Sequence, residues 1–242
     1  MSDPDAPLLE LRNVHAGYGA IQVLRDISFS IQKGDLIAMV GSNGAGKTTL
    51  IKTISGLIRP TQGDVLLGGK SIVGRDCAEI VRLGVTQAPE GRRIFSGLTV
   101  EENLKLGAFA RAGKTEQILR EDLEKVYGYF PRLKERRSQL AGTMSGGEQQ
   151  MCAIGRALMG RPSLLMIDEL SLGLAPIIVE ALLDILTQIH AGGTTVLLVE
   201  QDASVALGFC RRAIVLETGS VTYMGTAEDL LADDMLVKSY LG

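Results

Sequence analysis

The feature that most restricts the fold is the segment at residues 41–48, Gly-Ser-Asn-Gly-Ala-Gly-Lys-Thr. It matches the pattern GxxxxGK(S/T) and lies between a short apolar run, residues 36–40, and a helix-compatible segment, residues 47–57. This order predicts a strand, a loop and a helix, with backbone N–H groups and the helix N-terminus facing one concavity that can hold a di- or triphosphate. Lys47 would then neutralise the β- and γ-phosphate oxygens, and the Thr48 hydroxyl group would ligate Mg²⁺. The alternative, an ordinary glycine-rich turn, would not require this context of strand and helix.

The rest of the chain predicts an α/β fold with a mostly parallel core sheet, an N-terminal antiparallel β subdomain and a helical subdomain. We expect one domain over residues 1–242, with the helical subdomain inserted at about 99–160. Alternation of apolar and polar residues, or short apolar runs, predict strands at residues 8–15, 23–31, 63–69, 85–89, 163–168 and 194–200 and a hairpin at 214–225. Apolar residues at helical spacing predict helices at 76–84, within 99–160, at 176–189 and at 227–242.

Composition narrows the class of protein. The 242 residues carry a formal net charge of -3, which argues against a dedicated nucleic-acid-binding protein. The longest stretch without Asp, Glu, Lys or Arg is residues 185–199, which Gly192 and Gly193 interrupt, so it is too short to span a bilayer. Residues 1–12 are acidic where a secretory leader would be basic and then apolar, so we expect the chain to stay in the cytoplasm.

Two acidic residues end a predicted buried strand. Asp168 lies at its carboxyl end, where a carboxylate can hold Mg²⁺ directly or through water, and Glu169 follows. A carboxylate beside the metal ligand and near a γ-phosphate suits a general base or a water-orienting group. The alternative is a strand end with two solvated acids. A GTPase would also need a guanine-recognising NKxD motif, and the sequence has none.

A third motif, Met-Ser-Gly-Gly-Glu-Gln-Gln at residues 144–150, begins a predicted helix between the phosphate loop and Asp168. Ser145 is a candidate N-cap, and the paired glycines leave backbone N–H groups open to an anion. Seen alone, this motif would indicate only a loop and a helix cap.

With these three motifs in this order, the chain resembles the ATP-binding cassette (ABC) family over nearly all of its length. The resemblance implies the P-loop NTPase fold of ABC ATPases, with ATP and Mg²⁺ as cofactors. Residues 144–150 are similar to the family's signature motif, which completes the ATP site of a second subunit in a head-to-tail dimer. Tyr18 matches the aromatic residue that stacks on adenine, and residues 171–174 match the loop that crosses the dimer interface.

The resemblance, together with the motifs, assigns the following site residues. The nucleotide-binding residues are Tyr18, Gly41, Ser42, Asn43, Gly44, Ala45, Gly46, Lys47, Thr48, Thr49, Ser145, Gly146, Gly147 and Glu148. The metal ligands are Thr48, Asp168 and Glu90, and the catalytic residues are Glu169, Lys47, Gln201 and Glu90.

Three positions depart from the usual family pattern. Most cassettes have a Gln that senses the γ-phosphate and contacts the membrane subunit. In this chain, counting back nine residues from Thr99 places Glu90 at the position of that Gln, and Gln87 is the alternative. Leu170 replaces the usual proline after the Asp-Glu pair, which removes some preorganisation of the adjoining loop. Gln201 occupies the position of the usual switch histidine.

Within the family, the chain is similar to the ATPase subunits of branched-chain amino-acid uptake systems. The segments that carry this resemblance are 89–104, 130–137, 142–151, 171–176, 199–201 and 240–242. It implies a motor subunit on the cytoplasmic face of the membrane that pairs with itself or a related cassette and drives membrane permease subunits. A urea or amide importer is the alternative within the family. A regulatory cassette with little turnover is the rival from a different class, and a soluble cassette acting on DNA or ribosomes is a weaker one.

Overall fold

The computed structural model describes residues 6–113 and 115–232. The chain forms two compact units, each described by itself. Unit 1 combines residues up to Ile80 with those from Thr195 onward, and unit 2 comprises Val81–Thr194. Unit 1 is therefore built from two segments that are far apart in the sequence.

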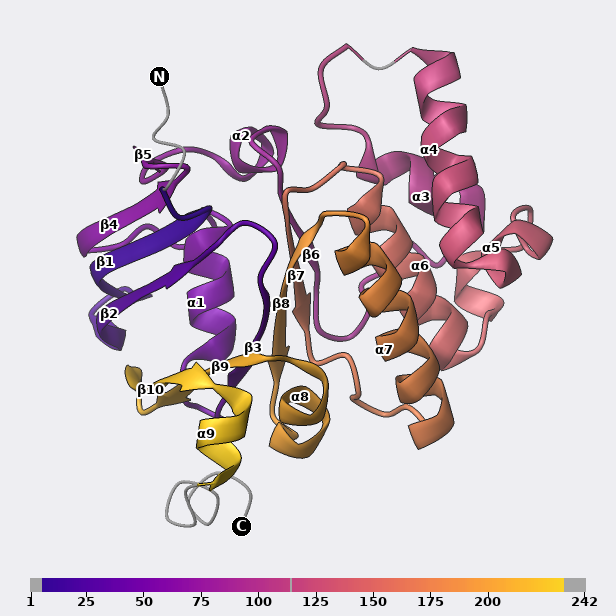
Figure 1. The fold of residues 1–242 in the computed structure, drawn as a ribbon. Coiled ribbons are helices and arrows are strands. Elements are labelled where there is room, and N and C mark those ends of the chain that lie inside the picture. Colours follow the sequence, from indigo (N-terminus) through magenta and orange to yellow (C-terminus); the bar gives the residue numbers. More distant parts are fainter. Residues whose placement is uncertain (1–5, 114, 233–242) are drawn as a thin grey trace. The chain divides into compact units, whose positions relative to one another are not determined.

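An antiparallel sheet forms one part of unit 1, with strand order β2-β1-β4-β5 (Figure 1). Its strands are β1 (Leu9–Tyr18), β2 (Ile21–Ile31), β4 (Gln62–Leu67) and β5 (Lys70–Ser71). Leu9 pairs with Ile31 at one end of the β1–β2 hairpin, and Tyr18 pairs with Ile21 at the other. Buried and exposed residues alternate along β1, as the period of a half-buried strand requires.

A second group of strands in unit 1 follows the order β10-β9-β3-β8. These strands are β3 (Leu36–Val40), β8 (Thr195–Glu200), β9 (Arg212–Glu217) and β10 (Ser220–Thr226). β3 lies between β8 and β9 and is parallel to both. Because β3 and β8 are buried along nearly their whole length, both are continuous apolar runs rather than alternating ones.

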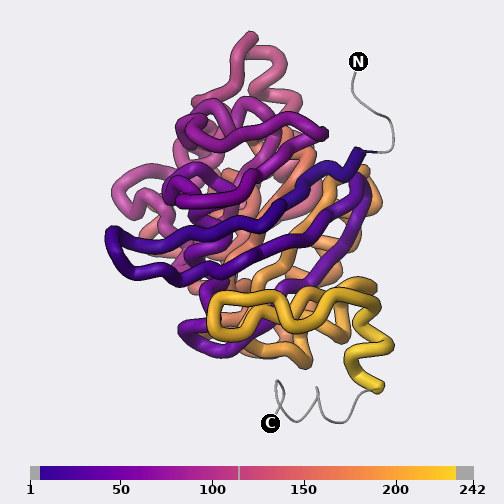
Figure 2. Tube along the Cα trace, turned by 90° about the vertical axis from the view of Figure 1, so that its left-hand side faces the viewer, coloured from indigo at the N-terminus to yellow at the C-terminus, as the bar shows by residue number. Residues whose placement is uncertain are grey.

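The hairpin of β9 and β10 lies alongside β2, as Figure 2 shows in yellow and indigo. Gly219 in its turn has a φ of 80° and donates from its backbone N–H to the carbonyl oxygen of Ala45 at 2.9 Å. A Cβ atom at Gly219 would lie 1.8 Å from the carbonyl oxygen of Val23, so only glycine fits there. The helices of unit 1 are α1 (Lys47–Ile54), α8 (Ala203–Phe209) and α9 (Ala227–Ala232), and α2 (Cys77–Arg82) begins in unit 1 and ends in unit 2.

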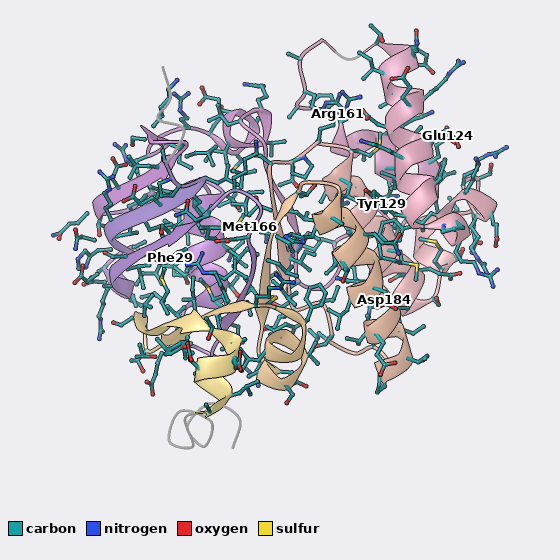
Figure 3. All side chains as sticks on the ribbon, viewed as in Figure 1. Phe29, Glu124, Tyr129, Arg161, Met166 and Asp184 are labelled. Atoms are coloured by element: carbon teal, nitrogen blue, oxygen red, sulfur yellow. The ribbon has the colours of Figure 1, made fainter. Side chains whose placement is uncertain are left out.

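Unit 2 contains one parallel pair of strands and a set of helices. The strands are β6 (Val85–Ala88) and β7 (Leu164–Asp168), with Ala88 opposite Ile167. The helices are α3 (Val100–Gly107), α4 (Glu116–Tyr129), α5 (Pro131–Glu135), the 3₁₀ turn η1 (Ala141–Thr143), α6 (Gly146–Leu158) and α7 (Pro176–Ala191). Figure 3 labels Tyr129 on α4, Asp184 on α7 and the buried Met166 on β7.

Close packing in unit 2 depends on two glycines. A Cβ atom at Gly107 of α3 would lie 1.8 Å from the carbonyl oxygen of Arg156 on α6, and one at Gly155 would lie 2.8 Å from Leu104. The two helices can approach so closely only because these positions lack side chains. The buried Asn103 fixes the loop before α3, since its side chain bonds both the N–H (2.8 Å) and the carbonyl oxygen (2.9 Å) of Phe95.

The predicted fold class is confirmed. The strands expected at residues 8–15 and 23–31, the helix at 176–189 and the hairpin at 214–225 are present. The helical segment expected at about 99–160 lies inside unit 2, which also contains β6, β7 and α7. The helix α8 was not predicted from the sequence. Of the helix expected at 227–242, Ala227–Ala232 is observed, and the remainder, with the motif at 240–242, lies outside the described residues, as does the start of the segment 1–12.

In the part of the chain that the structure describes, no helix is both long enough and apolar enough to cross a membrane.

Candidate functional site

The glycine-rich loop of unit 1 connects β3 to α1, as the sequence predicts. Only glycine fits at position 41, because a Cβ atom there would lie 2.3 Å from the carbonyl oxygen of Leu216. Gly44 has a φ of 84° and faces open space. Gly46 is the N-cap of α1 with a φ of 109°. The loop therefore packs closely against Leu216 at Gly41, while its tip at Gly44 remains accessible. This geometry allows a phosphate group to approach the backbone N–H groups of the loop.

Two side chains at the start of α1 add charge and oxygen to this loop. Lys47 is 6% exposed, and its Nζ donates a hydrogen bond of 2.6 Å to the carbonyl oxygen of Gly41. Thr48 is exposed, so its hydroxyl group is accessible to a ligand. The first turn of α1 contains no acidic residue, so nothing there offsets the positive end of the helix dipole.

Tyr18 contacts the same helix from the end of β1. Its hydroxyl group accepts a hydrogen bond from Lys52 Nζ at 3.3 Å, and the Lys52 ammonium group lies 5.5 Å from the centre of its ring. The hydrogen bond with the Thr49 hydroxyl group, followed by that with Lys52, lowers the pKa of Tyr18. Tyr18 is 46% exposed, so part of its side chain is accessible to a ligand.

Gln201 lies at the same edge of unit 1 as the loop. In the parallel pair of β3 and β8, Val40 is opposite Glu200, so Gly41 and Gln201 both follow paired strand ends. Asp202 then caps α8 by accepting a hydrogen bond from the N–H of Ser204 at 2.9 Å. Unit 1 therefore holds Tyr18, the phosphate loop and Gln201.

The predicted carboxylates lie in unit 2. Asp168, at the end of β7, is 2% exposed. Glu169 follows in the left-handed region with a φ of 53°, which an L-residue adopts only when its surroundings impose it. Leu170 is fully buried, so its side chain contributes to the core where the family usually has proline.

The structure separates the two residues proposed for the γ-phosphate-sensing position. Gln87 lies within β6, and its side chain lines an apolar groove. Glu90 lies in the turn beyond the carboxyl end of β6 and is exposed. Because β6 and β7 are parallel neighbours, Glu90 emerges at the same edge as Asp168 and Glu169. This placement favours Glu90 over Gln87 for a role beside those carboxylates.

Ser145 is the N-cap of α6, as expected, and forms a capping box with Glu148. The Ser145 hydroxyl group donates to Glu148 Oε2 at 2.8 Å, and Arg136 forms an ion pair with the same carboxylate at 2.8 Å. Burial acts to raise the pKa of Glu148, but the bonds from Ser145 and the charge of Arg136 outweigh it and lower the pKa overall. Glu148 is thus ionised and holds the start of the helix.

The two glycines of the signature motif have different neighbours. A Cβ atom at Gly147 would lie 2.8 Å from Ile178 of α7, so this glycine permits close packing of the two helices. A Cβ atom at Gly146 would lie 3.1 Å from both terminal nitrogens of Arg92. No sequence motif pointed to Arg92, because its left-handed backbone and its proximity to a residue 54 positions later are properties of the tertiary structure.

The donor set fits a magnesium nucleotide. The loop at residues 41–48 and Lys47 offer N–H groups and a cation, which suit phosphate oxygens. Thr48 in unit 1, and Asp168 and Glu90 in unit 2, each offer side-chain oxygen atoms, which suit Mg²⁺ rather than a softer metal. Among residues 6–113 and 115–232, no group of three or more His, Cys, Asp or Glu side chains is placed to hold a metal ion.

Comparison with known proteins decides the family. The model of the ABC transporter family matches residues 24–171, which is more than half of the chain and includes all three motifs. The chain belongs to the ABC transporter family. As an ABC ATPase it binds ATP and hydrolyses it.

Individual relatives resemble this cassette over nearly its whole length. It is 46% identical to the high-affinity branched-chain amino acid transport ATP-binding protein BraG of Pseudomonas aeruginosa, covering 97% of this chain and 100% of BraG. It is 35% identical to the probable branched-chain amino acid transport ATP-binding protein LivF of Archaeoglobus fulgidus, covering 97% and 99%. Among solved structures, a nucleotide-free ATP-binding cassette from an ABC transporter matches with a TM-score of 0.86 and 27% identity, covering 98% of this chain and 100% of that one.

Proposed function

We propose that this ABC ATPase is the motor subunit of an importer for branched-chain amino acids. The observation that carries the proposal is the 46% identity to BraG across the full length of that protein. The relatives named for this substrate class include both BraG and LivF. The substrate assignment depends on this similarity.

Each site residue has a role that its chemistry supports. Lys47 and the loop N–H groups bind the β- and γ-phosphates of ATP, and Tyr18 stacks on the adenine. Glu169 accepts the proton of a water molecule that attacks the γ-phosphorus, the bond between that phosphorus and the bridging oxygen breaks, and ADP leaves. Gln201 donates a hydrogen bond to the γ-phosphate, and Glu90 orients the water. Thr48, Asp168 and Glu90 would hold Mg²⁺, which would supply positive charge to the phosphate oxygens.

The signature motif supports a head-to-tail dimer, either with a second copy or with a related cassette. In this arrangement Ser145 and the first N–H groups of α6 meet the γ-phosphate of the nucleotide that the partner holds. Each site is then composite, so an isolated chain should hydrolyse ATP slowly. ATP binding closes the dimer, closure drives the permease subunits, and hydrolysis reopens it.

An apolar groove in unit 2 supports docking to a permease subunit at the cytoplasmic face of the membrane. The groove has a volume of about 380 Å³ and includes Phe95, Leu106, Phe109 and Arg156 in its lining. Phe109 is 78% exposed and Phe95 is 54% exposed, which is unusual for large apolar side chains outside an interface. The Arg156 guanidinium group lies 5.5 Å from the centre of the Phe95 ring and fixes its orientation.

Reconstitution with the permease subunits and the solute-binding protein tests the substrate and the docking surface. We expect uptake of labelled leucine, isoleucine or valine that requires ATP, and no uptake of urea or amides. Phe109→Arg should prevent co-purification with the permease, whereas Met224→Arg, at an exposed apolar residue of unit 1, should not. ATP-dependent urea uptake without leucine uptake would refute the assigned substrate.

Substitution of Ser145 tests the role of the signature motif across the dimer. Ser145→Arg should leave ATP binding to the monomer nearly intact but block ATP-driven dimerisation, because the added side chain occupies the space of the partner's γ-phosphate. Ser138→Arg, at an exposed position of the same unit, adds the same group outside α6 and should dimerise normally. Unchanged dimerisation of Ser145→Arg, measured by light scattering with ATP, would contradict this role.

A further inference from the structure

Three successive residues after Glu90 have left-handed backbones. The φ values are 71° at Gly91, 66° at Arg92 and 39° at Arg93. Glycine adopts this conformation freely, but for an arginine it is strained. Strain of this kind persists only where surrounding contacts impose it, so the turn at 91–93 needs a structural cause.

Hydrogen bonds hold this turn from two sides. Within the loop, the N–H of Arg92 donates to the carbonyl oxygen of Pro89 at 3.2 Å, and that of Arg93 donates to Gly91 at 2.6 Å. From α6, Nη2 of Arg156 donates to the carbonyl oxygen of Arg92 at 3.4 Å. The left-handed turn is thereby tied to the same helix that begins with the signature motif.

The turn directs the Arg92 side chain to two other loops of unit 2. Its terminal nitrogens lie against Gly146, the first residue of α6, where a Cβ atom would be 3.1 Å away. The same guanidinium group is 3.9 Å from the Cβ position of Gly173, in the loop that follows Glu169. Arg92 is half-buried, and within the described residues it forms no ion pair with a carboxylate. Its guanidinium group therefore lies close to the backbone at the start of the signature helix, and its Nη2 atom lies near the loop that follows Glu169.

The helix dipole does not account for this position, because it disfavours a cation at a helix N-terminus, and Glu148 in the first turn of α6 already pairs with Arg136. We propose that Arg92 is a positioning residue for ATP hydrolysis: its planar guanidinium group sets the spacing between the loop of Glu90, the signature turn at Gly146 and the loop of Gly173. The proposal rests on the proposed function of these loops.

The kcat and KM of the assembled transporter, together with the melting temperature, distinguish a positioning role of Arg92 from a role in ATP binding or in protein stability. Arg92→Ala should lower kcat by on the order of 10- to 100-fold, as expected for a small misplacement of catalytic groups, with little change in KM for ATP. Arg92→Gly removes both the side chain and the backbone strain, so it should melt at a higher temperature than Arg92→Ala and yet show the same loss of kcat. Arg92→Lys should not restore kcat, because the compact ammonium group of lysine cannot lie close to both Gly146 and Gly173 as the planar guanidinium group does.

Arg93→Ala is the matched control, because Arg93 shares the left-handed turn but its side chain reaches only the carbonyl oxygen of Glu90, at 3.4 Å. It should keep kcat within about twofold of the wild type, since it leaves the contacts at Gly146 and Gly173 in place. Wild-type kcat in Arg92→Gly, or equal losses in Arg92→Ala and Arg93→Ala, would overturn the proposal. Absence of turnover in the wild-type complex would instead refute the proposed function.

Hydrogen exchange in the isolated chain gives a readout that does not depend on turnover. Arg92→Ala and Arg92→Gly should both increase exchange at residues 146–150 and at 171–174, because the contact that orders both segments is lost. Arg93→Ala should leave exchange at both segments unchanged. Unchanged exchange in the Arg92 variants would refute the positioning role whatever the ATPase assay shows.

Discussion

Lys47 donates a hydrogen bond from its ammonium group to the carbonyl oxygen of Gly41, 2.6 Å away at the other end of the same loop. This backbone acceptor satisfies a cation that is only 6% exposed, at the position where we propose that a β- or γ-phosphate binds. On ATP binding, the ammonium group can exchange this neutral acceptor for charged phosphate oxygens, which are stronger partners.

Lys47→Ala should therefore weaken Mg-ATP binding severely. Loss of a charge-assisted interaction of about 3 kcal/mol corresponds to roughly 100-fold in affinity. Lys70→Ala, which removes an exposed lysine of β5 in the same unit, should bind as the wild type does. Unchanged affinity of Lys47→Ala in titration calorimetry would refute the assignment of the phosphate loop.

Glu169→Gln should preserve ATP binding and slow turnover by roughly 10²- to 10⁴-fold, because an amide cannot accept the proton of the attacking water. The substitution keeps the size of the side chain and the left-handed backbone at this position. Glu121→Gln, on the exposed face of α4, makes the same chemical change away from the site and should have no effect. The ATPase rate and nucleotide affinity are measured on the same preparations, and a wild-type rate in Glu169→Gln would remove it from this role.

Gln201 distinguishes the motor from a regulatory cassette with little turnover. A Gln amide can donate a hydrogen bond to the γ-phosphate but cannot titrate, whereas a histidine can do both. If a neutral hydrogen-bond donor to the γ-phosphate suffices for hydrolysis, Gln201→Ala should lower the ATPase rate by about 10²- to 10³-fold. Gln201→His should retain ATPase activity. The rate is measured in steady state with the permease subunits present. A wild-type complex that binds ATP without hydrolysing it, and that Gln201→His activates, would establish the regulatory alternative.

Asp122 should be a major determinant of the stability of unit 2. It is 5% exposed and pairs with Arg111 at 2.5 Å and with Arg161, labelled in Figure 3, at 2.7 Å. Asp122→Asn leaves the mostly buried Arg111 without its counter-charge, so the free energy of unfolding should fall by about 3 kcal/mol. Arg161→Gln removes only the ion pair between Arg161 and Asp122. Because the Arg161 side chain is 53% exposed, the free energy of unfolding should fall by less than ~1 kcal/mol. Denaturant unfolding of the two variants checks this, and equal losses would contradict it.

Much of the fold was predictable from local patterns. The apolar runs that became β3, β7 and β8, the alternation in β1 and β2 and the spacing in α7 each specify an element without reference to the rest of the chain. The helix α8 was not predicted, because its seven residues are too few for a periodic pattern and its start depends on the cap that Asp202 provides. Gln87 and Glu90 could be separated only once β6 was seen to end at Ala88.

By itself, the sequence determined which chemical groups this protein has for binding and hydrolysing a nucleotide. The order of the glycine-rich loop, the signature motif and the Asp168-Glu169 pair determined the family, because each motif is contiguous and its chemistry follows from adjacent residues. Only the tertiary structure decided that Glu169 is left-handed, that Leu170 is buried and that Arg92 lies against Gly146 and Gly173. The physical reason is that backbone strain and close approach between distant segments are set by packing, which brings together residues that no local pattern connects.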